Sequence, residues 1–282
     1  MRNRQPAVAG QFYESDAESL RRQIEGCFKH NLGPGRLPDR SDESDSESVV
    51  ATVNPHAGYM YSGPIAAHSF IKLSGKKSQL FVIIGPNHFG IGSGVAAPQS
   101  DEWITPLGSA KVDVKAAREL MMLSRMVDMD DSAHWREHSI EVQVPFLQFM
   151  FGENFTILPI SMAMQDKETA EHLGRSVASL LSTRNATLIA SSDFTHYEPH
   201  KVAEERDKKA IELILSFDID GFYRYIEEVN LTMCGFGPVA SVMYAAKRLG
   251  AQKAMLLSYA TSGLTGGDMK SVVGYASIAF VK

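Results

Sequence analysis

Three histidines, His56, His88 and His196, each follow a short apolar run of the chain by only a few residues. Glycine and proline flank the first two, so these turns are tight and hold the imidazoles on short tethers. Imidazole nitrogens bind transition metals and also serve as general acids or bases. If the three runs are parallel strands, their carboxyl ends share one edge of a sheet and the imidazoles meet there.

A cysteine and a fourth histidine are candidates for the same cluster. Cys234 lies just before an expected helix over residues 238–249, whose N-terminal dipole would stabilise the thiolate, the form that binds metal. Two imidazoles and one anionic ligand with open positions suit redox-active iron or copper, or zinc. We therefore predict a metal site made by His56, His88 and Cys234, with the sulfur within about 6 Å of at least one of the two rings.

Acid and base groups are expected beside this metal. Asp193 lies three residues before His196 and is expected to orient it, so that His196 acts as a general acid or base. His138, in Glu137-His138-Ser139, opens an expected helix and joins the cluster. The remaining histidines are expected to be solvated or hydrogen-bonded: His30, His68, His134, His172 and His200.

Apolar runs and helical patterns alternate after residue 48. The runs expected to be strands cover residues 49–53, 80–84, 155–160, 186–190, 255–259 and 272–280. The expected helices are Asp16–Phe28 with Ser15 as its cap, Val114–Leu123, Lys167–Leu181, Val202–Leu215 and Pro238–Leu249 with proline at its first position. This alternation predicts an α/β fold: a single three-layer α/β/α domain over residues 1–282 with a mostly parallel central sheet. Residues 33–48 are expected to form a solvated loop.

Composition narrows the class of protein. The chain has 282 residues, a formal net charge of −5 and two cysteines. The negative charge argues against nucleic acid as a partner, and no apolar run reaches the roughly 20 residues of a membrane helix. Few cysteines and no apolar leader predict a cytoplasmic protein. No dinucleotide-binding or P-loop glycine motif is present in the sequence.

Six motifs together resemble the Memo family. They begin at Arg4 and run to about residue 263, and they are Arg4–Tyr13, Pro55–Tyr59, Gly85–His88, Glu137–Glu141, Ser191–His196 and Thr232–Gly235. The resemblance implies a fold similar to class III extradiol ring-cleaving dioxygenases, which hold non-haem Fe(II) with two histidines and a glutamate. It also implies binding of iron or copper, and an animal member is described as a cell-motility factor that binds phosphotyrosine peptides.

The resemblance assigns roles by position. His56 and His88 match the two histidine ligands, and Cys234 stands where the dioxygenases have the carboxylate. Asp193 and His196 match the polar pair beside the metal. A thiolate is softer than a carboxylate, which favours Cu(I) or a different iron reactivity.

The same match places His138 as the histidine of the Glu-His-Ser motif. Where some Memo proteins have two adjacent histidines in the Gly85–His88 motif, this chain has Phe89 after His88.

Three functions compete on this basis. The first is a metal-dependent oxidoreductase acting on a small organic substrate. The second is a non-catalytic module that sequesters metal or binds an anionic peptide. The third is a metal-free hydrolase with Ser191 or Ser192 activated by His196 and Asp193, although no Gly-x-Ser-x-Gly turn is present.

Overall fold

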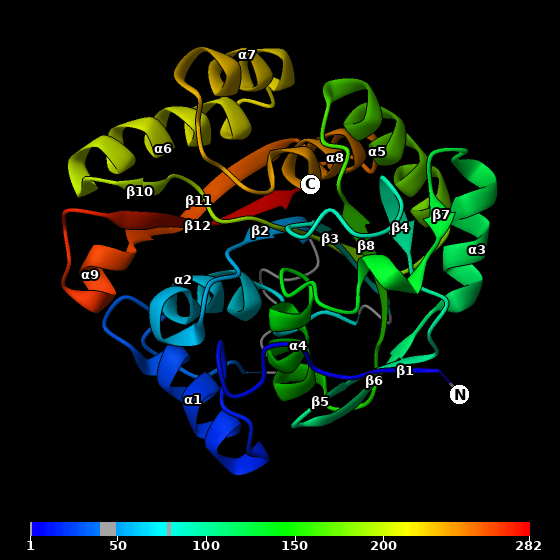
Figure 1. The fold of residues 1–282 in the computed structure, drawn as a ribbon, viewed down its shortest axis with the longest axis horizontal. Coiled ribbons are helices and arrows are strands. Elements are labelled where there is room, and N and C mark those ends of the chain that lie inside the picture. Colours follow the sequence, from blue (N-terminus) through cyan, green and yellow to red (C-terminus); the bar gives the residue numbers. More distant parts are fainter. Residues whose placement is uncertain (1, 40–48, 78–79) are drawn as a thin grey trace.

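A computed structural model describes residues 2–39, 49–77 and 80–282. A large central sheet has helices on both faces (Figure 1), so the predicted three-layer α/β/α architecture is confirmed. Residues 33–39 have no helix or strand, and the rest of the predicted loop, residues 40–48, lies outside the described residues.

The strands run in a mixed sheet whose centre is parallel. In order of pairing they are β1, β5, β6, β8, β3, β9, β2, β12 and β10, with β11 paired to β12, β4 paired to β8 and β7 paired to β4. The bounds are β1 Asn3–Arg4, β2 Val49–Asn54, β3 Leu80–Pro86, β4 Val95–Ala97, β5 Glu102–Thr105, β6 Gly108–Val112, β7 Asp128–Met129, β8 Thr156–Met162, β9 Ala186–Ser191, β10 His196–Glu198, β11 Lys253–Thr261 and β12 Val272–Val281.

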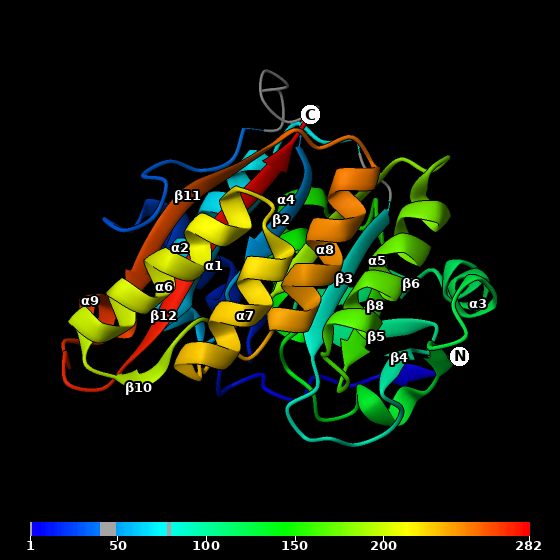
Figure 2. The same cartoon turned by 90° about the horizontal axis from the view of Figure 1, so that it is seen from above.

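Helices connect these strands. Their bounds are α1 Ala17–Lys29, α2 Tyr59–Lys72, α3 Val114–Leu123, α4 Val144–Phe151, α5 Lys167–Leu181, α6 His200–Leu215, α7 Ile219–Val229, α8 Phe236–Arg248 and α9 Ser262–Gly266, with short 3-10 turns at Asp131–Ala133 and Glu141–Gln143. Helices α5, α6, α7 and α8 cover one face of the sheet (Figure 2), while α1, α2 and α4 cover the other. None of the helices in the described residues is both long and apolar enough to cross a membrane.

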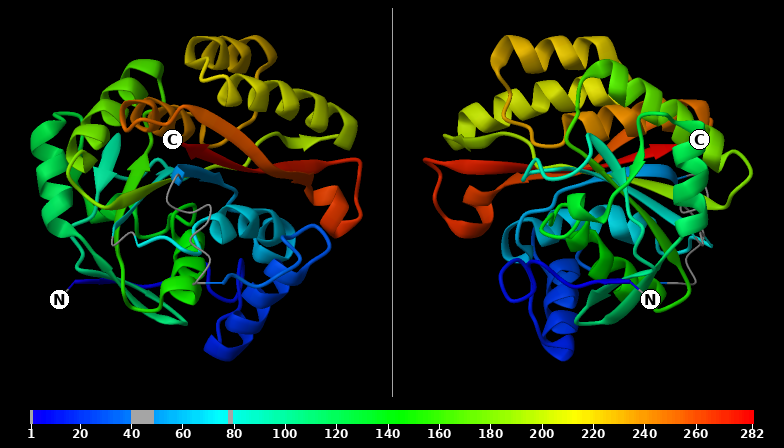
Figure 3. Two further views of the ribbon diagram at one scale, coloured as in Figure 1. Left: turned by 180° about the vertical axis from the view of Figure 1, so that it is seen from behind. Right: turned by 45° about the vertical axis from the view of Figure 1, so that its right-hand side comes forward.

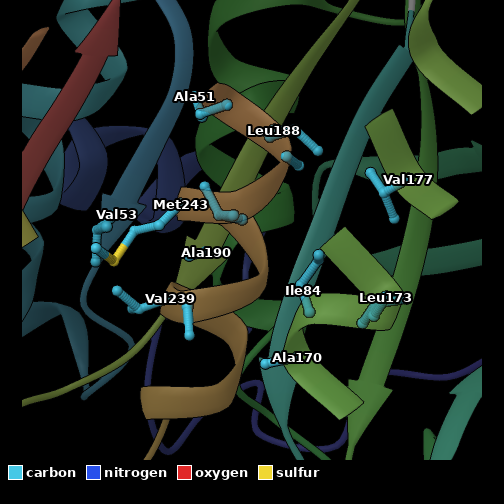
Figure 4. Packing of buried hydrophobic residues seen from close by; sticks show 14 of the residues in the cluster. Ala51, Val53, Ile84, Ala170, Leu173, Val177, Leu188, Ala190, Val239 and Met243 are labelled. Carbon is cyan, nitrogen blue, oxygen red and sulfur yellow. The ribbon is translucent and has the colours of Figure 1, made fainter. Parts of the chain in front are cut away.

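Alternate side chains of each central strand pack on opposite faces. On one face, Val239 and Met243 of α8 and Leu173 of α5 lie over Ile84 of β3 and Leu188 of β9 (Figure 4). The next residues along the same strands point to the layer of α1, α2 and α4. Because both faces are covered, β2 and β3 are buried along their whole length, which explains their continuous apolar sequences.

The helices differ from expectation at several ends. Asp16, not Ser15, caps α1, since its side chain accepts a hydrogen bond from the Ser19 amide. Helix α8 begins two residues before Pro238. The helix expected at residue 137 starts only at Val144, after a 3-10 turn.

Candidate metal centre

Three neighbouring parallel strands end together at one edge of the sheet. Asn54 of β2 pairs with Ser191 of β9, and Ile84 of β3 pairs with Ala190 of β9. The three loops that follow therefore leave the sheet side by side. They carry His56, His88 and the segment Asp193–His196.

His56, His88 and His138 form a compact group at this edge. In the part of the chain that the structure describes, these three residues offer ligand nitrogens that all lie within 4.8 Å of one another. His56 is buried, His138 is half-buried and His88 is the most exposed, so the group opens towards solvent at His88. The rings of His88 and His138 stack at 4.6 Å, and His56 stands nearly perpendicular to both.

The sulfur of Cys234 touches this group through His56. The distance from Sγ to Nε2 of His56 is 3.1 Å. The Asp193 amide also donates to the sulfur at 3.3 Å, and the Asp193 carboxylate accepts the His56 amide at 2.7 Å. Burial, together with the nearby Asp193 carboxylate, raises the pKa of the Cys234 thiol well above its usual value. A thiolate at this position therefore needs a cation beside it.

Two side chains hold the turn that carries Cys234. Gln165, which follows β8, donates to the Cys234 carbonyl at 2.9 Å and accepts the Gly237 amide. Ser192 accepts the amide of Gly235 at 2.9 Å. A Cβ on Gly235 would come within 2.5 Å of the Ser191 carbonyl oxygen, so only glycine allows the turn to pack this closely on β9.

Glu137 orients the two more exposed imidazoles. Its carboxylate accepts the backbone amide of His88 at 2.6 Å and lies 3.0 Å from His88 Nδ1 and 3.6 Å from His138 Nδ1. Burial would raise the pKa of Glu137, but the hydrogen bond from His88 and the two adjacent imidazoles lower it to about 2. The ionised carboxylate therefore accepts a hydrogen bond from the protonated Nδ1 of His88, and Nε2 keeps an available lone pair.

Burial keeps the other rings of the group neutral. It holds the pKa of His56 well below the usual range, with His88 contributing, and it lowers the pKa of His138 to about 4. Neutral imidazole is the form that binds metal.

His196 lies beside the cluster, but its partners differ from those expected. Its Nδ1 atom is 2.8 Å from the carbonyl oxygens of both Phe194 and Thr232, and its amide donates to the Thr232 hydroxyl. Carbonyl oxygens only accept, so Nδ1 carries the proton and Nε2 is free to accept one. The carbonyls orient this ring, and Asp193 instead binds the His56 amide.

The serines of the hydrolase hypothesis are arranged for other roles. Ser191 is buried and donates to the Ser139 carbonyl at 2.6 Å, while Ser192 donates to the Asp193 carbonyl. Neither hydroxyl contacts His196 among the hydrogen bonds of the described residues. This geometry gives the hydrolase hypothesis no support.

The residues that orient the cluster are not evident from the sequence pattern. Glu137 stands out in the sequence only as part of the motif around His138, although an acidic residue beside a candidate ligand is a usable signal. Gln143, which lies at the end of the 3-10 turn before α4, donates to Ser191 from a buried position. No spacing pattern in the sequence indicates that contact.

Comparisons with known proteins agree with the predicted resemblance. A family model described as Memo-like protein matches residues 4–279. A MEMO1 family protein of Methanothermobacter thermautotrophicus is 50% identical over 279 residues, which cover 98% of this chain and 99% of the relative. A MEMO1 family protein of Methanopyrus kandleri is 48% identical over 280 residues, with 98% of each chain covered.

One solved structure shares the fold at low sequence identity. The crystal structure of an uncharacterized protein from Escherichia coli K12 superposes with a TM-score of 0.56 at 14% identity, over 82% of this chain and 99% of that chain. Because the family model and these relatives span nearly the whole sequence, the chain belongs to the Memo-like family.

Proposed function

We propose that the protein holds one transition-metal ion through Nε2 of His56, Nε2 of His88 and the Cys234 thiolate. The observation that carries this proposal is the 3.1 Å contact between the Cys234 sulfur and His56 Nε2 inside a group of convergent imidazoles. Metal bonds of about 2.0–2.3 Å fit two donors at this separation. The donor set fits the ion, because burial raises the pKa of the Cys234 thiol and a bound cation would stabilise its thiolate form.

His138 is the alternative third ligand. Its ring is within the same 4.8 Å group as His56 and His88, and three neutral imidazoles also form a known metal-binding set. We favour Cys234 as ligand because it supplies negative charge next to His56, whereas the carboxylate of Glu137 faces Nδ1 of His88 and His138. His138 then remains beside the ion as a neutral, half-buried imidazole.

The proposed activity is that of a metal-dependent oxidoreductase. A bound iron or copper ion would supply one-electron redox chemistry and free coordination positions, and zinc would supply Lewis acidity. His196, with Nδ1 held by two carbonyls, accepts or returns a proton at Nε2. Glu137 keeps its charge and holds the rings of His88 and His138 in place.

A non-catalytic metal-binding role is the second candidate. The soft sulfur next to a buried imidazole favours tight binding of Cu(I) or zinc, which needs no substrate. The partner for either role is a small molecule or an anionic peptide, and a cytoplasmic location fits the reduced thiols that the site requires. Turnover separates the two candidates: stoichiometric metal with no reaction on phenolic and other small organic substrates favours sequestration.

Metal content tests the ligand assignment. Anaerobically purified wild-type protein is expected to hold about one iron, copper or zinc ion per chain. Cys234→Ala and His56→Ala are expected to lose at least tenfold in metal affinity, whereas His138→Gln should lose less. Elemental analysis and chelator competition measure both quantities. Full metal retention by Cys234→Ala together with loss in His138→Gln would transfer the third ligand to His138, and no bound metal in wild type would contradict the site.

A further inference from the structure

The Ser191 hydroxyl lies between three polar groups at the end of β9. Its oxygen is 2.6 Å from the Ser139 carbonyl oxygen, 2.9 Å from Gln143 Nε2 and 2.9 Å from His56 Nδ1. A hydroxyl has one proton to donate and two lone pairs to accept with. The three contacts therefore use its full hydrogen-bonding capacity.

The partners decide where each proton goes. A carbonyl oxygen can only accept, so the hydroxyl proton of Ser191 points to Ser139. The amide nitrogen of Gln143 can only donate, so it takes one lone pair of Ser191. The remaining lone pair faces His56 Nδ1, which must therefore carry a proton.

The orientation of the Gln143 amide is fixed independently. Its Nε2 atom also donates to the Pro55 carbonyl at 3.0 Å, and its Oε1 atom accepts from Asn54 Nδ2 at 3.2 Å. A flipped amide would place two acceptors, Oε1 and the Pro55 oxygen, against each other. The contacts of Gln143 with Pro55 and Asn54 therefore fix which atom donates to Ser191.

Burial removes water as a competing partner. Ser191, Gln143 and His56 are each at most 2% exposed. The second ring nitrogen of His56, Nε2, faces the Cys234 sulfur at 3.1 Å. A proton on Nδ1 leaves the Nε2 lone pair directed at the position where sulfur and imidazole would share an ion.

We propose that Ser191 is a positioning residue, which fixes the His56 proton on Nδ1 and so presents Nε2 as a metal ligand before any metal binds. The inference rests on the proposed metal site for its purpose, but the proton position is a property of the metal-free protein. Glu137 and His88 provide a separate example of the same arrangement, with a carboxylate in place of the hydroxyl.

The tautomer can be observed directly. In metal-free protein with ¹⁵N-labelled histidine, long-range ¹H–¹⁵N correlation spectra should show His56 protonated only at Nδ1, with the signal assigned from His56→Gln. Ser191→Ala removes the acceptor, so His56 is expected to become a mixture of both tautomers. Zn²⁺ affinity, measured by chelator competition, should fall about tenfold to a hundredfold in this variant.

Ser69→Ala is the matched control. Ser69 is also fully buried and donates to the Val53 carbonyl, but none of its hydrogen bonds within the described residues involves a histidine. It should leave both the His56 spectrum and the Zn²⁺ affinity unchanged. Protonation of His56 at Nε2 in the wild type, or an unchanged spectrum in Ser191→Ala, would overturn the inference. If wild type shows the Nδ1 tautomer but binds no Zn²⁺, the metal site fails and the proton assignment stands.

Discussion

Each oriented imidazole at this sheet edge places Nδ1 against an oxygen that accepts its proton. The acceptors are the Ser191 hydroxyl for His56, the Glu137 carboxylate for His88 and two carbonyls for His196. The Nε2 atoms are thereby left with lone pairs. Histidine ligands in metal sites are commonly oriented in this way through the nitrogen that does not bind the ion.

His134 shows what the absence of such a partner does. It was expected to be solvated or hydrogen-bonded, but it is 1% exposed and neither ring nitrogen has a well-formed hydrogen bond. Burial, with Arg4 contributing, lowers the pKa of His134 from the usual 6.5 to about 4. Between pH 6.5 and pH 4, His134 is therefore protonated in the unfolded chain but stays neutral in the folded protein.

This difference predicts an acid-dependent loss of stability. Above pH 6.5 the ring is neutral in both states, so it does not make the free energy of unfolding depend on pH. As the pH falls from 6.5 towards 4, the unfolded state binds the proton first, so the free energy of unfolding decreases by roughly 3 kcal/mol. Urea titrations of chelator-treated protein across this range should show a smaller decrease in both His134→Gln and His134→Phe. An unchanged pH slope in both variants would refute the assignment.

Residue types and spacing were enough to nominate the cluster, but they gave no contacts. His56, His88 and Cys234 stood out because each follows a strand or precedes a helix at the same expected edge. The orienting role of Glu137 and the burial of His134 depend on chain segments that meet only in the folded structure. Local sequence carries no record of such long-range packing.

At the scale of elements, the predictions succeeded where one side of a helix is apolar. Helices α3 and α5 match the expected ranges, Val114–Leu123 and Lys167–Leu181, because each shows a clear helical period. Helix α2 was missed. It is buried on most sides and contains Gly63 and Pro64, so neither periodicity nor propensity marks it as a helix.

The order of the strands in the sheet could not be predicted from the sequence pattern either. The apolar runs showed which segments are buried on both sides, yet β9 lies between β2 and β3 in the sheet, far from its order in the chain. Pairing of such distant segments is decided by how helices pack over the sheet. This order is what brings the loops after β2, β3 and β9 together.

Strand β12 and helix α6 pack so closely near the site that one added methyl group can test their contact. Gly274 of β12 passes over Asp207 of α6, and a Cβ there would lie 1.8 Å from the carboxylate. That carboxylate is fully buried and accepts the amide and hydroxyl of Thr195 and the hydroxyl of Tyr259. The contact therefore ties α6 and two strands to the loop that carries His196.

Gly274→Ala is expected to destabilise the protein by about 1–3 kcal/mol, because the methyl group must displace Asp207 or the strand. Gly26→Ala is the matched substitution. Gly26 lies on the exposed side of α1 with no atom within 4 Å of an added Cβ, so alanine should stabilise the helix by about 0.5–1 kcal/mol. Urea unfolding measures both. Equal effects in the two variants would mean that the β12–α6 contact is not tightly packed.

At the scale of the whole molecule, the N-terminal segment is part of the site's framework. It crosses the molecule on the side of the sheet that α1, α2 and α4 cover (Figure 3), and its Arg4 forms a buried ion pair with Glu141 at 2.6 Å. Arg4 also donates to the carbonyls of His134 and Glu137. Glu141 in turn accepts the amides of Ala7 and Val8 and the hydroxyl of Tyr13.

These bonds join the N-terminal segment to the loop of Glu137 and His138, which is far away in the sequence. Phe12 lies against the His138 ring at a centroid distance of 4.7 Å, and its carbonyl accepts the amide of Tyr59, the first residue of α2. The first motif of the sequence therefore has a structural explanation. It packs the loop of Glu137 and His138 against the rest of the protein.

Removing one charge of this pair should be costly, because the other is left buried without its partner. Arg4→Met is expected to lower the free energy of unfolding by about 3–5 kcal/mol. Arg22→Met removes an ion pair with Glu18 whose side chains are 63% and 80% exposed, and it should cost at most about 1 kcal/mol. Both values come from urea unfolding of metal-free protein.

A double-variant cycle decides whether the pair itself carries the effect. Glu141→Gln keeps an acceptor for the amides of the N-terminal segment but removes the charge. If the buried ion pair is the cause, Arg4→Met with Glu141→Gln should be less destabilised than the sum of the single variants, with a coupling of about 0.5–3 kcal/mol. Strict additivity, or a loss in Arg4→Met no greater than in Arg22→Met, would show that the N-terminal segment is held mainly by apolar packing. Its bonds to the loop of His138 would then contribute little to stability.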